Sequence, residues 1–415
     1  MKKRLFYLLC LVAFASSCVK QGPAGPTGTA GISGTQGIAG INGVDGINGK
    51  DCYVGKDGIN GTAFCFECHK GDSKIIGKQV EYNTSVHATG TTFYGENHDQ
   101  CAGCHNNEGF NQRIKQGGNF TLPGAMPASG FSSPTPISCY TCHSIHTKYD
   151  STDFRFKSIV PVVCLTDSSI TIDRGNSNIC INCHQSRPLV VVDSSNKTVT
   201  NLKYAADNDL IKITTSRFGP HHGPQGNMLN GASTLGKNQS GAFQIGTTTL
   251  YGNGSISHAN LTDAATGNKL VTCIKCHMAA PLLGAAPNGG GHSFDVTYFA
   301  SATATTKTLN ITGCLDCHTA TEAQSKFTKT QNTVKQKLIT LQNLLGVKGW
   351  VVADSTNANY QLIVASATKP LLVTALQAKV LYNYRFVIED KSFGVHNAEY
   401  ANEILDNAIS LAQSW

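Results

Sequence analysis

Charged and aromatic residues are both scarce in this chain of 415 residues. Only 14% of residues are charged, 8% are aromatic and 40% are hydrophobic. These fractions are low for one large conventional core and argue against a TIM barrel or a Rossmann enzyme. The composition also excludes a coiled-coil rod and a membrane protein with several spans. Something other than apolar side chains must therefore fill part of the interior.

The chain also lacks a strong excess of charge of one sign. Its formal net charge is +7, but three basic residues belong to the export signal that the N-terminus predicts. Without them, 30 basic residues stand against 26 acidic ones, a balance of +4. No stripe of Lys and Arg stands out, so we expect no nucleic-acid partner.

The first 17 residues predict an export signal. Residues 2–4 are basic, residues 5–14 are apolar, and small residues at 15–17 precede Cys18. The apolar run is too short to span a bilayer. Small residues before a cysteine resemble a lipobox, so we expect cleavage before Cys18 and its lipidation, which anchors a protein without spanning the membrane. Ordinary cleavage nearby is the alternative, because Ala15 stands where a lipobox usually has Leu.

Either kind of cleavage places the mature protein outside the cytoplasm. We expect a bacterial outer-membrane lipoprotein that lies at the cell surface or faces the periplasm. Residues 18–63 would be its tether, because glycine fills thirteen of the fourteen third positions from Gly22 to Gly61. That period is typical of a collagen triple helix, where only glycine fits at the axis. Few prolines and an intruding Cys52 leave an extended Gly-rich linker as the alternative.

Six CxxCH motifs carry the chemistry of the chain. Two thiols three positions apart on one turn can reach the two vinyl groups of a haem, and the adjacent imidazole then meets the iron. Zinc knuckles, redox dithiols and a disulfide framework are the alternatives, but none needs a His after every second cysteine. We therefore predict six covalently bound c-type haems. The attachment cysteines are Cys65, Cys68, Cys101, Cys104, Cys139, Cys142, Cys180, Cys183, Cys273, Cys276, Cys314 and Cys317, and the proximal iron ligands are His69, His105, His143, His184, His277 and His318.

Through these motifs, residues 64–320 resemble the multihaem c-type cytochromes. The resemblance implies a hexahaem domain that is mainly α with extensive loops and is organised around six stacked haems. The haems would then supply the interior that apolar side chains do not. The implied partners are other cytochromes or redox proteins, or a mineral or soluble terminal acceptor.

Histidine is abundant enough to give every iron a second ligand. Beyond the signal, methionine occurs only at positions 126, 228 and 278, and Met278 follows His277 directly, so it cannot reach the opposite haem face. Eight histidines lie outside the motifs, and His98 suits a distal role least because it is so close to Cys101. The predicted distal ligands are His87, His146, one of His221 and His222, His258, His292 and His396, with the order of pairing left open.

Two more cysteines of the mature chain, Cys52 and Cys164, lie outside the motifs. In an oxidising compartment they can pair with each other. A bond between two chains through Cys52 is the alternative.

Residues 321–415 contain no CxxCH motif and are predicted to be helical. Apolar residues recur at helical spacing over 327–346, and a second apolar helix is predicted from Pro370 to about residue 386. A third is predicted over about 398–412, with Asn397 as its N-cap.

The stretch EDKSFGVHN at 389–397 resembles a segment of some nitrite-reductase-like and hydroxylamine-oxidoreductase-like multihaem proteins. The resemblance implies that long C-terminal helices pack on the haem domain, that a homo-oligomer can form, and that His396 ligates a haem. The nitrite reductases of that group mark their catalytic haem with CxxCK, whereas all six motifs here end in His.

Three functional classes follow from these features. A membrane-tethered relay in which most or all haems have two His ligands is favoured by the lipobox, the tether and the surplus histidines, and it needs no catalytic residue. A reductase or oxidase of a small nitrogen or sulfur oxyanion, such as nitrite, hydroxylamine or tetrathionate, is the alternative. It needs one open iron, lined by groups such as Arg187 or Arg217. The third class is a subunit of a filament or of a collagen-like scaffold.

Overall fold

The computed structural model describes most of the chain from Lys74 onward. The signal, the tether and the first motif, Cys65–His69, lie outside the described residues, as does Cys52. The chain separates into two compact units, 1–56 and 57–415, and every described residue belongs to the second. The described residues are 74–117, 129–187, 189, 191–195, 197–199, 202–231, 241–245, 257–281, 289–301, 303–354 and 357–415.

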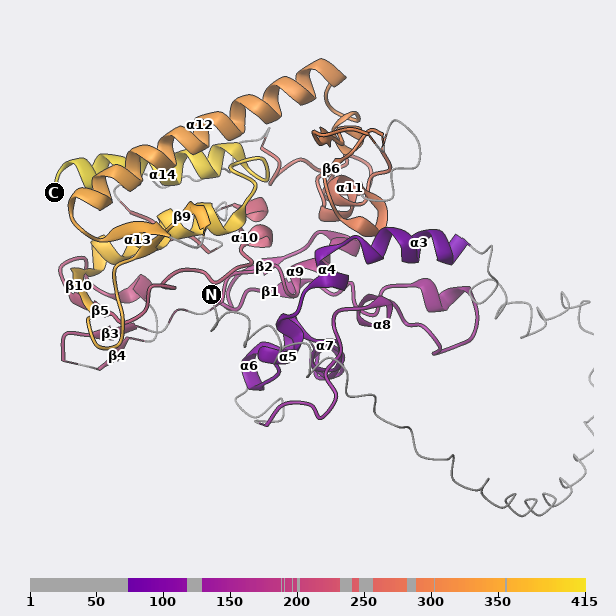
Figure 1. The fold of residues 1–415 in the computed structure, drawn as a ribbon, viewed down its shortest axis with the longest axis horizontal. Coiled ribbons are helices and arrows are strands. Elements are labelled where there is room, and N and C mark those ends of the chain that lie inside the picture. The colour runs from indigo at the N-terminus through magenta and orange to yellow at the C-terminus, as the bar shows by residue number, and fades with distance from the viewer. Residues whose placement is uncertain are drawn as a thin grey trace, which may run out of the picture. The chain divides into compact units, whose positions relative to one another are not determined.

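Helices joined by long loops dominate the described chain, which confirms the predicted mainly α class (Figure 1). The early helices are short, and the three long helices lie near the C-terminus. The α-helices are α3 (Lys74–Asn83), α4 (Val86–Thr89), α5 (Thr92–Gly95), α6 (Asp99–His105), α7 (Asn107–Lys115), α8 (Cys139–Cys142), α9 (Asn178–Ile181), α10 (Gln225–Asn230), α11 (Cys273–His277), α12 (Ala320–Val347), α13 (Ala375–Asp390) and α14 (Ala398–Gln413). The short 3-10 helices are η1 (Ser151–Phe154), η2 (Gly175–Ser177), η3 (Leu202–Tyr204), η4 (Gly291–Ser293) and η5 (Thr312–Cys314).

The strands are short, and all their pairings are antiparallel. One four-stranded sheet has the order β10-β5-β3-β4, and three further pairs are β1-β2, β6-β7 and β8-β9. The strands are β1 (Val162–Val163), β2 (Thr171–Ile172), β3 (Val191–Asp193), β4 (Thr198–Val199), β5 (Leu210–Ile213), β6 (Thr297–Tyr298), β7 (Thr308–Leu309), β8 (Val351–Asp354), β9 (Asn357–Ile363) and β10 (Leu371–Thr374).

The second predicted C-terminal helix begins later than the sequence pattern suggests. Residues 371–374 form β10 and pair with β5, with Leu371 opposite Ile213. The prediction of a helix from Pro370 was therefore wrong at its start, because a strand distant in sequence offers those residues hydrogen-bond partners. Helix α13 starts where Thr374 forms a capping box with Gln377.

The other two C-terminal helices agree with their patterns. Helix α12 extends the pattern at 327–346 back to Ala320, because Thr319 and Glu322 form a capping box there. Helix α14 spans Ala398–Gln413, and the Asn397 side chain accepts a hydrogen bond from the Tyr400 amide, as predicted for an N-cap. Figure 1 shows α12 running alongside α14, and the two are in contact.

The main apolar core joins these helices to the middle of the chain. Its residues come from α12, α13 and α14, from β8, β9 and β10, and from segments between 191 and 245. Helix α13 is buried along most of its length. By contrast, only one small cluster of buried apolar residues lies near the motifs in the described chain, around Val162 and Ile172. No described helix is long and apolar enough to cross a membrane.

Candidate functional site

Each described CxxCH motif forms one helical turn. Two of the five lie in α6 and α11. In the other three, the amide of the motif His donates to the carbonyl of the first motif cysteine, at 2.9 Å for His143, 2.9 Å for His184 and 3.0 Å for His318. Residues at i, i+3 and i+4 share one face of a turn. The two thiols and the imidazole of each motif therefore issue from the same side of the chain.

The motif cysteines lie close to one another without being cross-linked. None of the ten described motif cysteines forms a disulfide. The Cys104 thiol interacts with the Cys183 thiol, and Cys180 interacts in the same way with Cys273. The last two described motifs also touch, because a Cβ on Gly313 would lie 2.3 Å from the Lys275 carbonyl oxygen. Thiols held together but unbonded fit cysteines that carry thioether-linked groups.

Four motif histidines face four of the predicted distal histidines at one common spacing. Two imidazoles bound to opposite faces of one metal ion, with metal–nitrogen bonds of about 2 Å, have ring centroids roughly 6 Å apart. The observed centroid separations match this value. They are 6.0 Å for His184 with His87, 6.0 Å for His105 with His221, 6.2 Å for His143 with His292, and 6.1 Å for His277 with His396.

The fifth described motif histidine, His318, lies near another predicted distal ligand. Burial lowers the pKa of His258 below its usual value, and the nearby imidazole of His318 lowers it further, although hydrogen bonding to Val395 opposes both. His146 contacts the Tyr140 hydroxyl at 3.1 Å and stacks on the Tyr149 ring. The motif histidine left for His146 is His69, outside the described residues, so that part of the prediction stays a prediction.

Of the adjacent pair that the sequence left open, His221 is the one that faces a motif histidine. Its Nε2 is buried and makes no hydrogen bond. The Nδ1 of His222 instead lies 3.0 Å from Glu389 Oε2. His98 lies 3.7 Å from Glu96 and beside Cys101, a trio whose ligand atoms gather within 4.8 Å, but Cys101 already belongs to a motif.

The Nδ1 atoms of several of these imidazoles are held by acceptors, which leaves Nε2 available to a metal. A carbonyl oxygen can only accept, so the Nδ1 atoms that contact one must carry the proton. Hydrogen bonds of this kind fix the tautomer and the ring orientation of metal-binding histidines. The contacts are His143 with Phe154 O at 2.7 Å, His277 with Phe294 O at 2.9 Å, His258 with Val395 O at 3.0 Å, His184 with Gln225 Oε1 at 3.0 Å and His396 with Asp390 Oδ1 at 2.6 Å.

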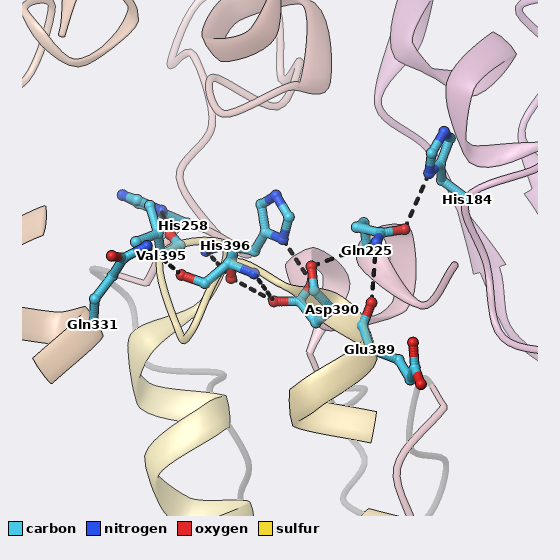
Figure 2. A network of polar contacts seen from close by, with 9 residues as sticks. His184, Gln225, His258, Gln331, Glu389, Asp390, Val395 and His396 are labelled. Carbon is cyan, nitrogen blue, oxygen red and sulfur yellow. Dashed lines mark hydrogen bonds and ion pairs between the residues drawn. The ribbon is translucent and has the colours of Figure 1, made fainter. Parts of the chain in front are cut away.

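Figure 2 shows how the turn between α13 and α14 gathers three of these histidines. Gln225 accepts from His184 and donates to the carbonyls of Glu389 and Asp390 at 3.2 and 3.4 Å. At the other end of the turn, the carbonyl of Val395 accepts from His258. One short segment therefore orients residues that belong to three of the imidazole pairs.

Several residues with strained backbone conformations lie at or next to the candidate haem ligands. Six non-glycine residues of the described chain have positive φ, a conformation that persists only where the surroundings impose it. Two of them are His146 and His221, and Phe294 supplies the carbonyl for His277. The others are Tyr149, Lys391 and Phe393. Gly290, just before His292, has φ of 63°, and a Cβ there would lie 1.8 Å from the Ala279 carbonyl oxygen.

The charge state of His87 and His221 also suits metal binding, because only a neutral imidazole offers a lone pair. Burial lowers the pKa of His87 to about 4, and the neighbouring His184 contributes. Burial also lowers the pKa of His221 to about 4, helped by Arg187. With its buried Nε2 lacking a hydrogen bond, His221 needs a partner that a metal would supply. Thiols and imidazoles together therefore fit covalently attached haem with two axial His ligands.

Comparison with known proteins adds little to this geometry. No protein-family model and no curated protein matches the chain. A solved structure described as the outer cell wall cytochrome OcwA is similar, with a TM-score of 0.44 and 19% sequence identity. The similarity covers 81% of this chain and 50% of that one, so the chain spans about half the length of that structure.

The residues that orient the imidazoles were missed by sequence reasoning. Gln225 and Asp390 carry no motif of their own, and carbonyl acceptors such as that of Phe154 have no side-chain signal at all. The proximity of Asp390 to His396 in the sequence was the only local sign.

Proposed function

We propose that the protein is an electron-transfer protein of the multihaem c-type cytochrome class. The observation that carries the proposal is the recurring separation of about 6 Å between a motif imidazole and a second imidazole. When bound, haem supplies one-electron redox chemistry. The chain's own residues would anchor each haem through two thiols and supply two imidazoles to its iron.

Six haems, each with two His ligands, is the arrangement we propose. The described imidazole pairs support four of the pairings directly, and the electrostatic contact of His258 with His318 supports a fifth. His69 with His146 is the pairing that remains by elimination. The proposed pairs are His69 with His146, His105 with His221, His143 with His292, His184 with His87, His277 with His396, and His318 with His258.

The alternative of an oxyanion reductase finds less support in the same geometry. It needs one iron with an open face. Arg187 lies beside His105 and His221 and lowers the pKa of both, and in the proposed arrangement these two imidazoles would occupy both sides of the iron there. Arg217 is exposed. A relay is therefore the better account of the described motifs.

Contacts between motifs suggest the order of the relay. The motif of Cys104 contacts the motif of Cys183, which in turn contacts that of Cys273. The motif of Cys273 then meets the last one at Gly313. We infer a row of haems attached at 101–105, 180–184, 273–277 and 314–318, in that order.

The cellular setting is proposed from the sequence. Lipidation of Cys18 would anchor the protein at a bacterial outer membrane, and the Gly-X-Y tract would hold the haem domain away from the lipid. The partners would be other redox proteins, or a mineral or soluble acceptor outside the cytoplasm. A homo-oligomer, through the tract or the C-terminal helices, belongs to the same proposal.

Voltammetry of the holoprotein adsorbed on an electrode tests the proposed activity. We expect reversible reduction of all haems, and no catalytic current when nitrite, hydroxylamine or tetrathionate is added. Rapid oxidation of the reduced protein by a soluble ferric chelate should accompany this result. A sustained catalytic current with any of the three substrates would contradict the relay and favour the reductase.

A further inference from the structure

Asp390 differs from every other acceptor that holds a candidate axial histidine in the described chain. Its Oδ1 lies 2.6 Å from Nδ1 of His396, and its side chain has no exposed surface. The corresponding acceptors for His143, His277 and His258 are backbone carbonyls, and that for His184 is an amide oxygen. Among the described histidines of the six proposed pairs, His396 is therefore the one with a buried carboxylate at hydrogen-bond distance of its ring; the similar contact of Glu389 is with His222, which belongs to none of these pairs.

The turn around Asp390 fixes this contact. The Ser392 hydroxyl donates to Asp390 Oδ2, and the Ser392 amide lies 3.3 Å from the same oxygen. The Ser392 hydroxyl also accepts from the amide of His396 at 3.2 Å. The Asp390 carboxylate and the His396 backbone are thus tied to one serine, which helps to hold the Asp390–His396 geometry.

A second carboxylate near a candidate ligand provides an internal comparison. Glu81 Oε2 lies 3.7 Å from Nδ1 of His292, beyond a hydrogen bond. Glu81 is also partly exposed and forms an ion pair with Lys78 at 3.0 Å. Screening by water and by Lys78 weakens its effect on His292. The two sites therefore differ in distance, burial and competing charge.

A carboxylate that accepts the Nδ1 proton makes the imidazole a more basic ligand. A more basic ligand and a buried negative charge both stabilise the ferric over the ferrous state, and hydrogen bonding around the axial ligand is one of the ways a protein tunes haem potential. We propose that Asp390 makes the haem held by His277 and His396 the lowest in reduction potential of the set. The haem would take up one electron with no bond made or broken. Asp390 is a positioning residue that acts through His396.

This inference rests on the proposed function and adds an order of reduction to it. The motif at 273–277 contacts the motifs on both sides of it in the inferred row. A low-potential haem inside the row would be reduced last and would hold an electron only briefly. Electrons would therefore collect on the haems on either side of it.

Spectroelectrochemical titration of the holoprotein tests the inference. Asp390→Asn keeps the shape and an acceptor oxygen but removes the charge. We expect the reduction potential of the lowest component to rise by at least about 59 mV, which corresponds to a tenfold change in its one-electron equilibrium constant. Asp390→Glu should keep the potential low. The matched control Glu81→Gln should leave the lowest component in place, and His396→Ala should remove that component and create a haem that binds carbon monoxide.

The inference is overturned if the lowest component stays in place in Asp390→Asn, or if it moves as much in Glu81→Gln. Should Asp390→Asn fail to load haem, near-infrared magnetic circular dichroism of the unaltered protein decides the question. One haem with an imidazolate-like ligand field supports the inference, and six alike refute it. Carbon monoxide binding by the unaltered protein would instead contradict the proposed function, so the two failures are distinguishable.

Discussion

His221 and His222 are adjacent in the sequence but serve different partners in the structure. The His221 ring lies 6.0 Å from that of His105, with a buried Nε2 that makes no hydrogen bond. Nδ1 of His222 lies 3.0 Å from the buried carboxylate of Glu389, which also pairs with Arg385. Positive φ at His221 allows the chain to present the two rings differently.

The first prediction separates these two neighbours. His221→Ala should leave haem attachment intact and convert one haem in six to a form that binds carbon monoxide when reduced, because the ligand opposite His105 is gone. His222→Ala is the matched control and should bind none. Titration of the reduced variants with carbon monoxide measures both. Binding by the His222 variant alone would reverse the assignment.

The second prediction concerns attachment. Replacing Cys314 and Cys317 together by Ala should lower the covalent haem content by one in six, because both thioether bonds of one motif are lost. Mass spectrometry of the intact protein and the pyridine haemochrome assay give the count. Cys164→Ala is the control, since Cys164 is buried but belongs to no motif. Retention of all six haems in the double variant would refute the attachment at this motif.

The third prediction tests the loop that presents His292. Gly290→Ala should open the iron opposite His143, as His292→Ala should, because a Cβ would meet the Ala279 carbonyl oxygen at 1.8 Å and φ is 63°. Carbon monoxide binding again measures the result. Gly346→Ala in α12, where nothing lies within 4 Å of the added carbon, is the control and should bind none. A closed iron in Gly290→Ala would show that the loop does not depend on this glycine.

The fourth prediction concerns the stability of the C-terminal core. Leu341 in α12 is fully buried, so Leu341→Ala should lower the free energy of unfolding by about 2–5 kcal/mol. Val347 ends the same helix and is 88% exposed, so Val347→Ala should change it by less than about 0.5 kcal/mol. Guanidinium denaturation of the holoproteins, followed by circular dichroism, compares them. Equal effects would contradict the packing described for α12.

Local features of the site could be predicted from the sequence. Each CxxCH motif depends on residues within one turn, and the motif histidines indeed lie on such turns. Counting the histidines outside the motifs also shows that the chain has enough of them to give each iron a second ligand. Pairing could not be predicted, because His87 meets His184 only after several loops have folded between them.

The fold shows the same division between local and distant causes. Helix α14 and its cap at Asn397 depend on neighbouring residues and were predicted correctly. The sequence pattern predicted a helix for residues 371–374, but they form a strand that pairs with β5, which lies far away in the sequence. Asp390 had no recognisable role until the turn brought its carboxylate to His396.

Electron paramagnetic resonance of the fully oxidised holoprotein, followed by carbon monoxide addition after reduction, tests the central claim most directly. A relay in which every haem has two His ligands predicts six low-spin ferric haems and no carbon monoxide complex. A high-spin haem in the folded, unaltered protein, together with carbon monoxide binding, would contradict that account.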